Sequence, residues 1–243
     1  MTKHIIIIPT YNEIKNIKAM VYTISNLPQQ FDICFVDDNS PDNTSIEIKK
    51  HQKAITSHTI HLIHRTTKKG LGSAYIEGFT FAINHNYDYI YQMDCDFSHN
   101  PNELLTFRLL LEQGNDFVIG SRYINDGSTY NWSLGRILIS RLASFYVKFT
   151  TGLPVNDPTS GFSGISASII KKIIYTSQIN KFHGYAFQVA LKFLAFSFGA
   201  TLKESPICFE ERRLGQSKFN SSILIEAVLK VPLLRFINLK NKT

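Results

Sequence analysis

The chain reads Tyr89-Ile90-Tyr91-Gln92-Met93-Asp94-Cys95-Asp96, an apolar and aromatic run that ends in two carboxylates. Such a run is typical of a buried β-strand. Because side chains alternate between the two faces of a strand, Asp94 and Asp96 are expected to share a face. Two carboxylates in this arrangement can bind one hard divalent cation, which can in turn hold a diphosphate. An Asp-x-Asp pair is also common in solvated loops, so its interpretation depends on the surrounding sequence.

The first half of the chain alternates between short apolar runs and segments with helical periodicity. Strands are predicted at Ile5–Ile8, Asp32–Val36, Ile60–His64, Tyr89–Met93 and Phe117–Gly120, and helices at Ile14–Leu27, Thr44–Ala54, Ser73–Asn84 and Pro101–Glu112. This alternation predicts an α/β fold with a mostly parallel central sheet flanked by helices. A polar loop follows each of the first four strands, and ligands bind at those strand ends in open α/β sheets.

The second half is less regular, and no linker or repeat divides it from the first. We predict a helix at Ser133–Thr151, turns at Asp157–Phe162, a helix at Tyr185–Phe198, a strand at Thr201–Ile207 and a basic loop at Glu210–Lys218. A final helical pattern should kink or break at Val231-Pro232. One domain spanning residues 1–243 is the preferred organisation.

Composition narrows the classes of partner. With 44% hydrophobic and 19% charged residues the chain is globular, and a net charge of +7 favours anionic partners. Nucleotide phosphates and a membrane surface fit better than nucleic acid, because the basic residues form no single tract. Three scattered cysteines without a C-x-x-C pair indicate a reduced, cytosolic chain. No apolar run reaches the ~18 residues of a membrane span.

Three other loops contain side chains that could bind parts of a nucleotide. After the first strand, Tyr11 could stack on a base and Glu13 could accept hydrogen bonds from it, although an ordinary turn explains both. After the second strand, Asp38 could hold a base or ribose, and helix capping is an equal alternative. The basic loop with Lys68 and Gly70 suits an anion at a helix start, or is simply solvated.

His99 and His183 are interpreted as loop histidines rather than as bases.

Nine segments in order resemble family 2 glycosyltransferases of the Rossmann-like GT-A fold, and more narrowly the dolichyl- or polyprenyl-phosphate mannosyltransferases. They are PTYNE (9–13), VDDNSPDNT (36–44), RTTKKGLGSAY (65–75), MDCDFSH (93–99), GSRY (120–123), NWSLGRILISR (131–141), DPTSGF (157–162), GYAFQ (184–188) and ERRLGQSK (211–218).

The resemblance implies a role for particular residues. Asp94 and Asp96 would hold Mg²⁺ or Mn²⁺ on the diphosphate, with Ser98 as a candidate third ligand. The donor site would comprise Pro9, Tyr11, Glu13, Asp38, Ser40, Lys68, Gly70, Asp94, Arg213 and Lys218. The acceptor phosphate would be bound by Arg122, Arg136 and Ser140. Asp96, Arg122 and Arg136 would be the catalytic residues.

The activity implied is inverting transfer of mannose from GDP-mannose to a polyprenyl phosphate, which gives a β-linked product. Another donor such as UDP-glucose, or another acceptor, is the enzymatic alternative. A weakly active nucleotide-sugar-binding subunit of a membrane complex is the non-enzymatic one. It is motivated by two departures from the family pattern: Ala190 replaces a frequent acid, and Ser163 replaces a common arginine.

The resemblance also divides the chain into a donor half, residues 1–125, and an acceptor half, residues 126–243. Ser133–Thr151 and Ile223–Leu239 mix apolar with basic residues, which suits an anionic membrane surface. Burial of these C-terminal amphipathic helices against the core is about equally compatible with the pattern. We therefore expect peripheral association with the cytoplasmic face of a membrane, with a small membrane-anchoring subunit as a candidate partner.

Overall fold

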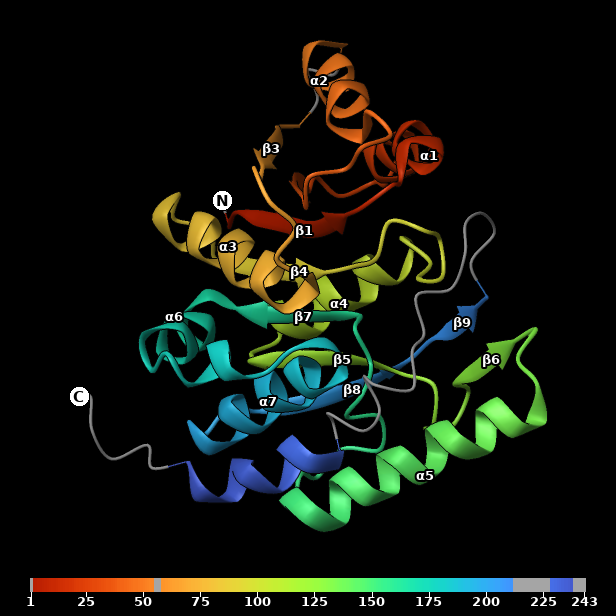
Figure 1. Cartoon of the computed structure of the whole chain (residues 1–243), viewed down its shortest axis with the longest axis vertical. Helices are drawn as coiled ribbons and strands as arrows, with labels where there is room; N and C mark the ends of the chain where they lie inside the picture. Colours follow the sequence, from red (N-terminus) through yellow and green to blue (C-terminus); the bar gives the residue numbers. More distant parts are fainter. Residues whose placement is uncertain (1, 55–57, 212–227, 238–243) are drawn as a thin grey trace.

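A computed structural model describes residues 2–54, 58–211 and 228–237 (Figure 1). The strands are β1 (His4–Thr10), β2 (Asp32–Asp37), β3 (Ile60–His64), β4 (Tyr89–Gln92), β5 (Phe117–Ser121), β6 (Ser128–Tyr130), β7 (Ser163–Ser166), β8 (Leu202–Pro206) and β9 (Cys208–Glu210). The helices are α1 (Ile14–Ser25), α2 (Thr44–Ala54), α3 (Leu71–Asn84), α4 (Glu103–Glu112), α5 (Leu134–Thr151), α6 (Ala167–Tyr175), η1 (Gln178–Lys181), α7 (Gly184–Ser197) and η2 (Val231–Phe236).

The central sheet has seven strands in the order β3-β2-β1-β4-β7-β5-β8. Strands β1 to β4 pair in parallel, as do β5 and β8, which confirms the predicted mostly parallel sheet. The carboxyl ends of β1, β2 and β4 therefore meet at one edge, so the loops that follow them converge there. A separate two-stranded sheet joins β6 to β9.

Strand β7 and helix α6 were not predicted from the sequence. Strand β7 runs antiparallel between β4 and β5, yet its sequence, Ser163-Gly164-Ile165-Ser166, has one large apolar residue. Gly164 is required there, since a Cβ at this position would lie 2.8 Å from Leu111 and 2.9 Å from Tyr91. A small-residue strand between two apolar neighbours has no hydrophobic pattern from which it could be recognised.

The core consists of two hydrophobic clusters, one on each face of the sheet. Ile5 and Ile7 of β1 belong to the cluster beneath α3, α6 and α7, whereas Ile6 and Ile8 belong to the cluster beneath α1, α2 and α4. Strict alternation in an all-isoleucine run is what burial on both faces of a parallel strand requires. All four side chains are fully buried, so the sheet is covered on both sides.

Helices α5 and η2, which are distant in the sequence, lie side by side along one edge of the molecule (Figure 1). Helix α5 begins after Ser133, whose hydroxyl caps it by accepting from the backbone N–H of Arg136. Near the end of the chain the backbone changes to a 3₁₀ helix at Val231, as expected from Pro232.

Within the ranges that the structure describes, no helix has both the length and the apolar character needed to cross a bilayer.

Candidate active site

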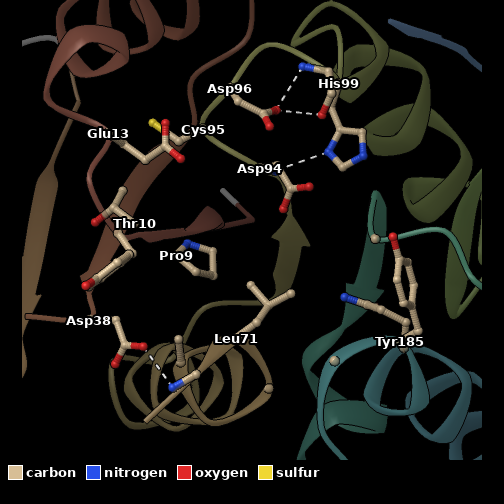
Figure 2. A pocket seen from close by; sticks show the side chains of 18 of the residues that line it. Pro9, Thr10, Glu13, Asp38, Leu71, Asp94, Cys95, Asp96, His99 and Tyr185 are labelled. Carbon is tan, nitrogen blue, oxygen red and sulfur yellow. Dashed lines mark hydrogen bonds between the residues drawn. The ribbon is translucent and has the colours of Figure 1, made fainter. Parts of the chain in front are cut away.

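A cavity of about 560 Å³ opens at the carboxyl edge of the sheet. It brings together most of the predicted site residues: Pro9, Tyr11, Glu13, Asp38, Lys68, Gly70, Asp94, Asp96, Ser98, Arg122 and Arg136. Figure 2 shows Asp94 and Asp96 on one side of this cavity and Asp38 on another. Ser40 and Ser140 are not among its lining residues. Arg213 and Lys218 lie outside the described residues.

The loop after β4 folds back on itself around Asp96. The backbone N–H and the hydroxyl of Ser98 both donate to Oδ1 of Asp96, at 3.1 and 2.6 Å. Phe97, between them, has a φ of +62°, a conformation that is strained for a bulky residue. Strain of this kind is found where a functional loop is held by its surroundings. Ser98 thus orients the Asp96 carboxylate within the protein itself.

His99 holds the other aspartate of the pair. Its Nδ1 accepts a hydrogen bond from the backbone N–H of Asp94 at 3.1 Å, and its ring stacks on Phe162 with centroids 4.7 Å apart. Burial lowers the pKa of His99 to about 4; the charges of Asp96 and Asp157 oppose this shift, and the charge of Arg122 adds to it. The neutral imidazole is therefore an acceptor at Nδ1 and carries its proton on Nε2. This is the structural role expected for His99, and it fixes the position of the Asp94 backbone.

Asp38 organises the basic loop. Its carboxylate accepts from the backbone N–H groups of Lys69 and Gly70, both at 2.8 Å, and from Arg65 Nη1 at 3.0 Å. Burial alone would raise the pKa of Asp38, but these hydrogen bonds lower it below its ordinary value. The predicted direct contact of Asp38 with a base or ribose thus competes with an internal role. Asp38 shapes the loop that carries Lys68 and Gly70.

The remaining donor-side residues are positioned by neighbouring turns. Lys68 Nζ lies 3.6 Å from the centroid of the Tyr11 ring, so a cation already covers the face expected to stack on a base. Ser40 accepts from the Asn12 backbone N–H and donates to Asp37, which ties the first two loops together. Asn43 has a φ of +68°, the left-handed conformation expected at this position.

Arg122 is held by a buried ion pair that the sequence did not reveal. Its Nε and Nη2 donate to the two carboxylate oxygens of Asp157, each at 2.7 Å, and the Asp157 side chain is fully buried. Nη2 also donates to the Thr159 hydroxyl at 3.0 Å. Such a bidentate pair fixes the guanidinium plane. Arg122 therefore enters the cavity in a set orientation, but with part of its donor capacity already used.

Arg136 approaches the cavity from the first turn of α5. Its Nη1 donates to Glu211 at 2.8 Å, and its guanidinium lies 4.0 Å from the centroid of the Trp132 ring. Both partners of the ion pair are substantially exposed, so a bound anion can compete for Arg136. Ser140, one turn further along the helix, accepts a hydrogen bond from the Tyr123 hydroxyl instead of facing the cavity.

Lys192 of α7 is a buried cation behind the same loop. Its Nζ donates to the backbone carbonyls of Ser160 and Gln188, at 2.7 and 3.3 Å, and its side chain is fully buried. Burial lowers the pKa of Lys192 to about 7, although the charge of Asp157 opposes this shift. Lys192 thus joins α7 to the turn that carries Asp157 and, through it, positions Arg122.

Replacing Lys192 with methionine should remove a pH dependence of stability. The folded-state pKa near 7 lies below the ordinary value of 10.5, so between those pH values the unfolded chain binds more protons. Wild-type stability should consequently rise with pH in that window, by about 3 kcal/mol between pH 7 and 9.5. Urea unfolding of both proteins at the two pH values measures the difference. Lys171→Met, at an exposed position, is the control; an equal rise in Lys192→Met would contradict the assignment.

Comparisons with known proteins identify the family of this chain. The family model for glycosyl transferase family 2 matches residues 5–174. Polyprenol monophosphomannose synthase of Mycolicibacterium smegmatis is 37% identical over 227 residues, covering 93% of this chain and 84% of that protein. Undecaprenyl-phosphate mannosyltransferase of Micrococcus luteus is 38% identical, covering 93% and 90%.

The fold is shared with solved structures of low sequence identity. A mannosyltransferase from Pyrobaculum calidifontis, in complex with GDP-Man and Mn²⁺, superposes with a TM-score of 0.57. It is 12% identical, and the match covers 96% of this chain and 69% of that one. This neighbour confirms the expected GT-A architecture. With a family match over more than half of its length and two relatives above 30% identity, this chain belongs to glycosyltransferase family 2.

Proposed function

We propose that this glycosyltransferase transfers mannose from GDP-mannose to the phosphate of a polyprenyl phosphate, with inversion at the anomeric carbon. The observation that carries the proposal is that one cavity contains both the aspartate pair, Asp94 and Asp96, and the two arginines, Arg122 and Arg136. A site of this kind can bind a diphosphate leaving group and an anionic nucleophile at once. The relatives named for polyprenol and undecaprenyl-phosphate substrates support the acceptor class.

The aspartate pair fits a Mg²⁺ or Mn²⁺ ion. Carboxylates are hard oxygen ligands, and Ser98 holds Asp96 in place at the cavity wall. The described residues contain no group of three or more His, Cys, Asp or Glu side chains placed to hold a metal. Two protein carboxylates completed by substrate phosphates are, however, the usual Mg²⁺ arrangement. A bound metal would offset the charge that develops on the leaving diphosphate.

The nucleophile in this reaction needs orientation more than activation. A phosphate monoester has a second pKa of about 6, so it is largely ionised at neutral pH without a general base. The absence of an acid at position 190 is therefore tolerable. Ala190 is fully buried in the core and does not line the cavity, and Ser163 donates to Gln92 within the sheet. Both departures from the family pattern lie away from the proposed reaction.

We assign donor binding and acceptor binding to different sides of the cavity. Residues 1–125 supply the proposed donor side, with Pro9, Tyr11 and Glu13 beside the loop that Asp38 organises. Residues 126–243 supply most of the acceptor side, although Arg122 comes from the end of the first half. Arg122 is preorganised by Asp157, while Arg136 would exchange Glu211 for phosphate.

An exposed apolar stripe on α5 suits a membrane surface. Leu134, Leu138, Leu142, Phe145 and Phe149 follow helical spacing, and each is more than half exposed. Exposed apolar side chains of residues 228–236 extend this surface, where the Tyr146 hydroxyl donates to the Val228 carbonyl. Exposed basic residues on the same elements would meet anionic headgroups. Because Arg136 lies at the start of this helix, membrane contact would place a lipid phosphate near the cavity.

The double variant Phe145→Ser/Phe149→Ser should bind anionic vesicles at least tenfold more weakly. Each phenylalanine contributes about 1.5–3 kcal/mol when fully withdrawn from water, and interfacial burial recovers part of that. Vesicle co-sedimentation measures the partition coefficient, and activity on a short-chain, water-soluble acceptor should be unchanged. Tyr22→Ser/Leu109→Ser, which removes exposed side chains from α1 and α4, is the matched control. Equal effects of the two double variants would rule out a specific docking face.

A donor panel tests the proposed function. The purified protein, Mg²⁺ or Mn²⁺ and a short-chain polyprenyl phosphate are incubated with labelled GDP-mannose, UDP-glucose and other sugar nucleotides. Label should enter the organic phase with GDP-mannose as the preferred donor. Transfer only from a uridine donor would overturn the sugar assignment, and the lack of any organic-soluble product would overturn the function.

A further inference from the structure

We propose that the indole N–H of Trp132 is a third ligand of the acceptor phosphate, beside Arg122 and Arg136. This inference rests on the proposed function and adds a residue that sequence reasoning missed. Trp132 lines the cavity and precedes α5 by two residues. Its Nε1 is buried, and no hydrogen-bond partner for it exists among the residues that the structure describes. Buried polar groups are nearly always paired, so this one calls for an explanation.

The chemistry of the group limits what its partner can be. An indole N–H donates and cannot accept, so only an acceptor atom can satisfy it. The Arg136 guanidinium lies 4.0 Å from the ring centroid and that of Arg122 lies 5.4 Å from it. Two cations beside a donor-only group favour an anionic oxygen over a neutral carbonyl or hydroxyl. A phosphate oxygen meets each of these conditions.

Contacts with Phe209 and Arg136 hold the Trp132 ring in place. Phe209 meets Trp132 edge-to-face with centroids 5.3 Å apart, while Arg136 covers the ring at cation–π distance. Glu211 accepts from Arg136 at 2.8 Å, so one carboxylate already lies near this position. Acceptor phosphate would replace Glu211 on Arg136 and gain the indole hydrogen bond that Glu211 does not make. Trp132 thereby favours phosphate over the internal carboxylate.

Trp132→Phe removes the N–H and keeps an aromatic ring beside Arg136. The acceptor KM should rise about tenfold to a hundredfold, the range expected for a hydrogen bond to a charged group, while the KM for GDP-mannose stays within about twofold. Tyr130→Phe, at an exposed neighbouring aromatic residue, is the control and should change neither constant. An acceptor KM within about twofold of wild type, or a rise confined to the donor KM, would overturn the proposal.

An indole signal in nuclear magnetic resonance and the variant Arg136→Gln test the Trp132 contact independently of the kinetics of Trp132→Phe. Trp132 is the single tryptophan of the chain, so its indole gives one ¹H–¹⁵N signal, which should move downfield as farnesyl phosphate is added. A signal that does not move at saturation contradicts the contact even if Trp132→Phe folds poorly. Arg136→Gln separates this inference from the proposed function. If Arg136→Gln raises the acceptor KM and Trp132→Phe does not, only the Trp132 contact fails; if neither does, the acceptor site itself is wrong.

Discussion

Asp96→Asn should reduce kcat/KM for mannosyl transfer about a thousandfold, which corresponds to a loss of about 4 kcal/mol of transition-state stabilisation. The substitution keeps the size of the side chain and an acceptor oxygen for the Ser98 hydroxyl, which lies 2.6 Å from the carboxylate. It removes the negative charge that a divalent cation requires. The loop should therefore keep its shape while metal affinity is lost.

Metal binding and activity, measured together, identify the cause of the lower kcat/KM of Asp96→Asn. Mn²⁺ binding in the presence of GDP, followed by electron paramagnetic resonance, should weaken in parallel with the rate. Asp126→Asn is the control, because Asp126 is exposed and its φ of +68° suits asparagine. If Asp96→Asn kept its rate within about threefold of wild type, the metal assignment would be wrong.

Asp157→Ala should destabilise the protein by about 3–5 kcal/mol, the range for breaking one side of a buried ion pair. Asp157 is fully buried and receives three hydrogen bonds from Arg122, two from the side chain and one from the backbone. Burial alone would raise the pKa of Asp157, but Arg122 and the nearby Lys192 lower it. Without this carboxylate, the buried guanidinium of Arg122 loses its compensating charge.

Urea unfolding measures this effect, and two comparisons interpret it. Lys50→Ala breaks the surface ion pair with Glu47 and should cost no more than about 1 kcal/mol. The double variant Asp157→Leu/Arg122→Met should be less destabilised than the sum of its single variants, because no unpaired charge remains between these two positions. Strict additivity, or a cost below about 1 kcal/mol for Asp157→Ala, would show that the pair does not hold the site together.

Local sequence patterns were sufficient for the regular part of the fold. Runs such as Ile5–Ile8 are apolar on both faces, and only a covered parallel strand satisfies that pattern, so β1 to β5 were predicted in order. Strand β7 was missed because its burial comes from its neighbours: Gly164 lies between Leu111 and Tyr91, which are distant in sequence. Helix α6, which follows it directly, was missed along with it.

Site residues were predictable where the signal lies within one segment, and were missed where it depends on a partner distant in the sequence. Asp94 and Asp96 were recognisable because both follow one strand, and the polar loops of parallel strands converge. The contacts that position the site join residues far apart: Arg122 with Asp157, and Lys192 with Ser160. An aspartate in a turn or a lysine in a helix carries no local signal of such a partner. The DPTSGF and GYAFQ segments marked these regions without revealing their roles.

The structure of the product made from GDP-mannose and a short-chain polyprenyl phosphate tests the proposed reaction most directly. We expect an organic-soluble mannosyl phosphodiester in which nuclear magnetic resonance shows the β configuration at the anomeric carbon. Formation should require Mg²⁺ or Mn²⁺ and should fall together with acceptor affinity in Arg136→Gln. An α-linked product, or mannose attached to a hydroxyl group instead of the lipid phosphate, would contradict it.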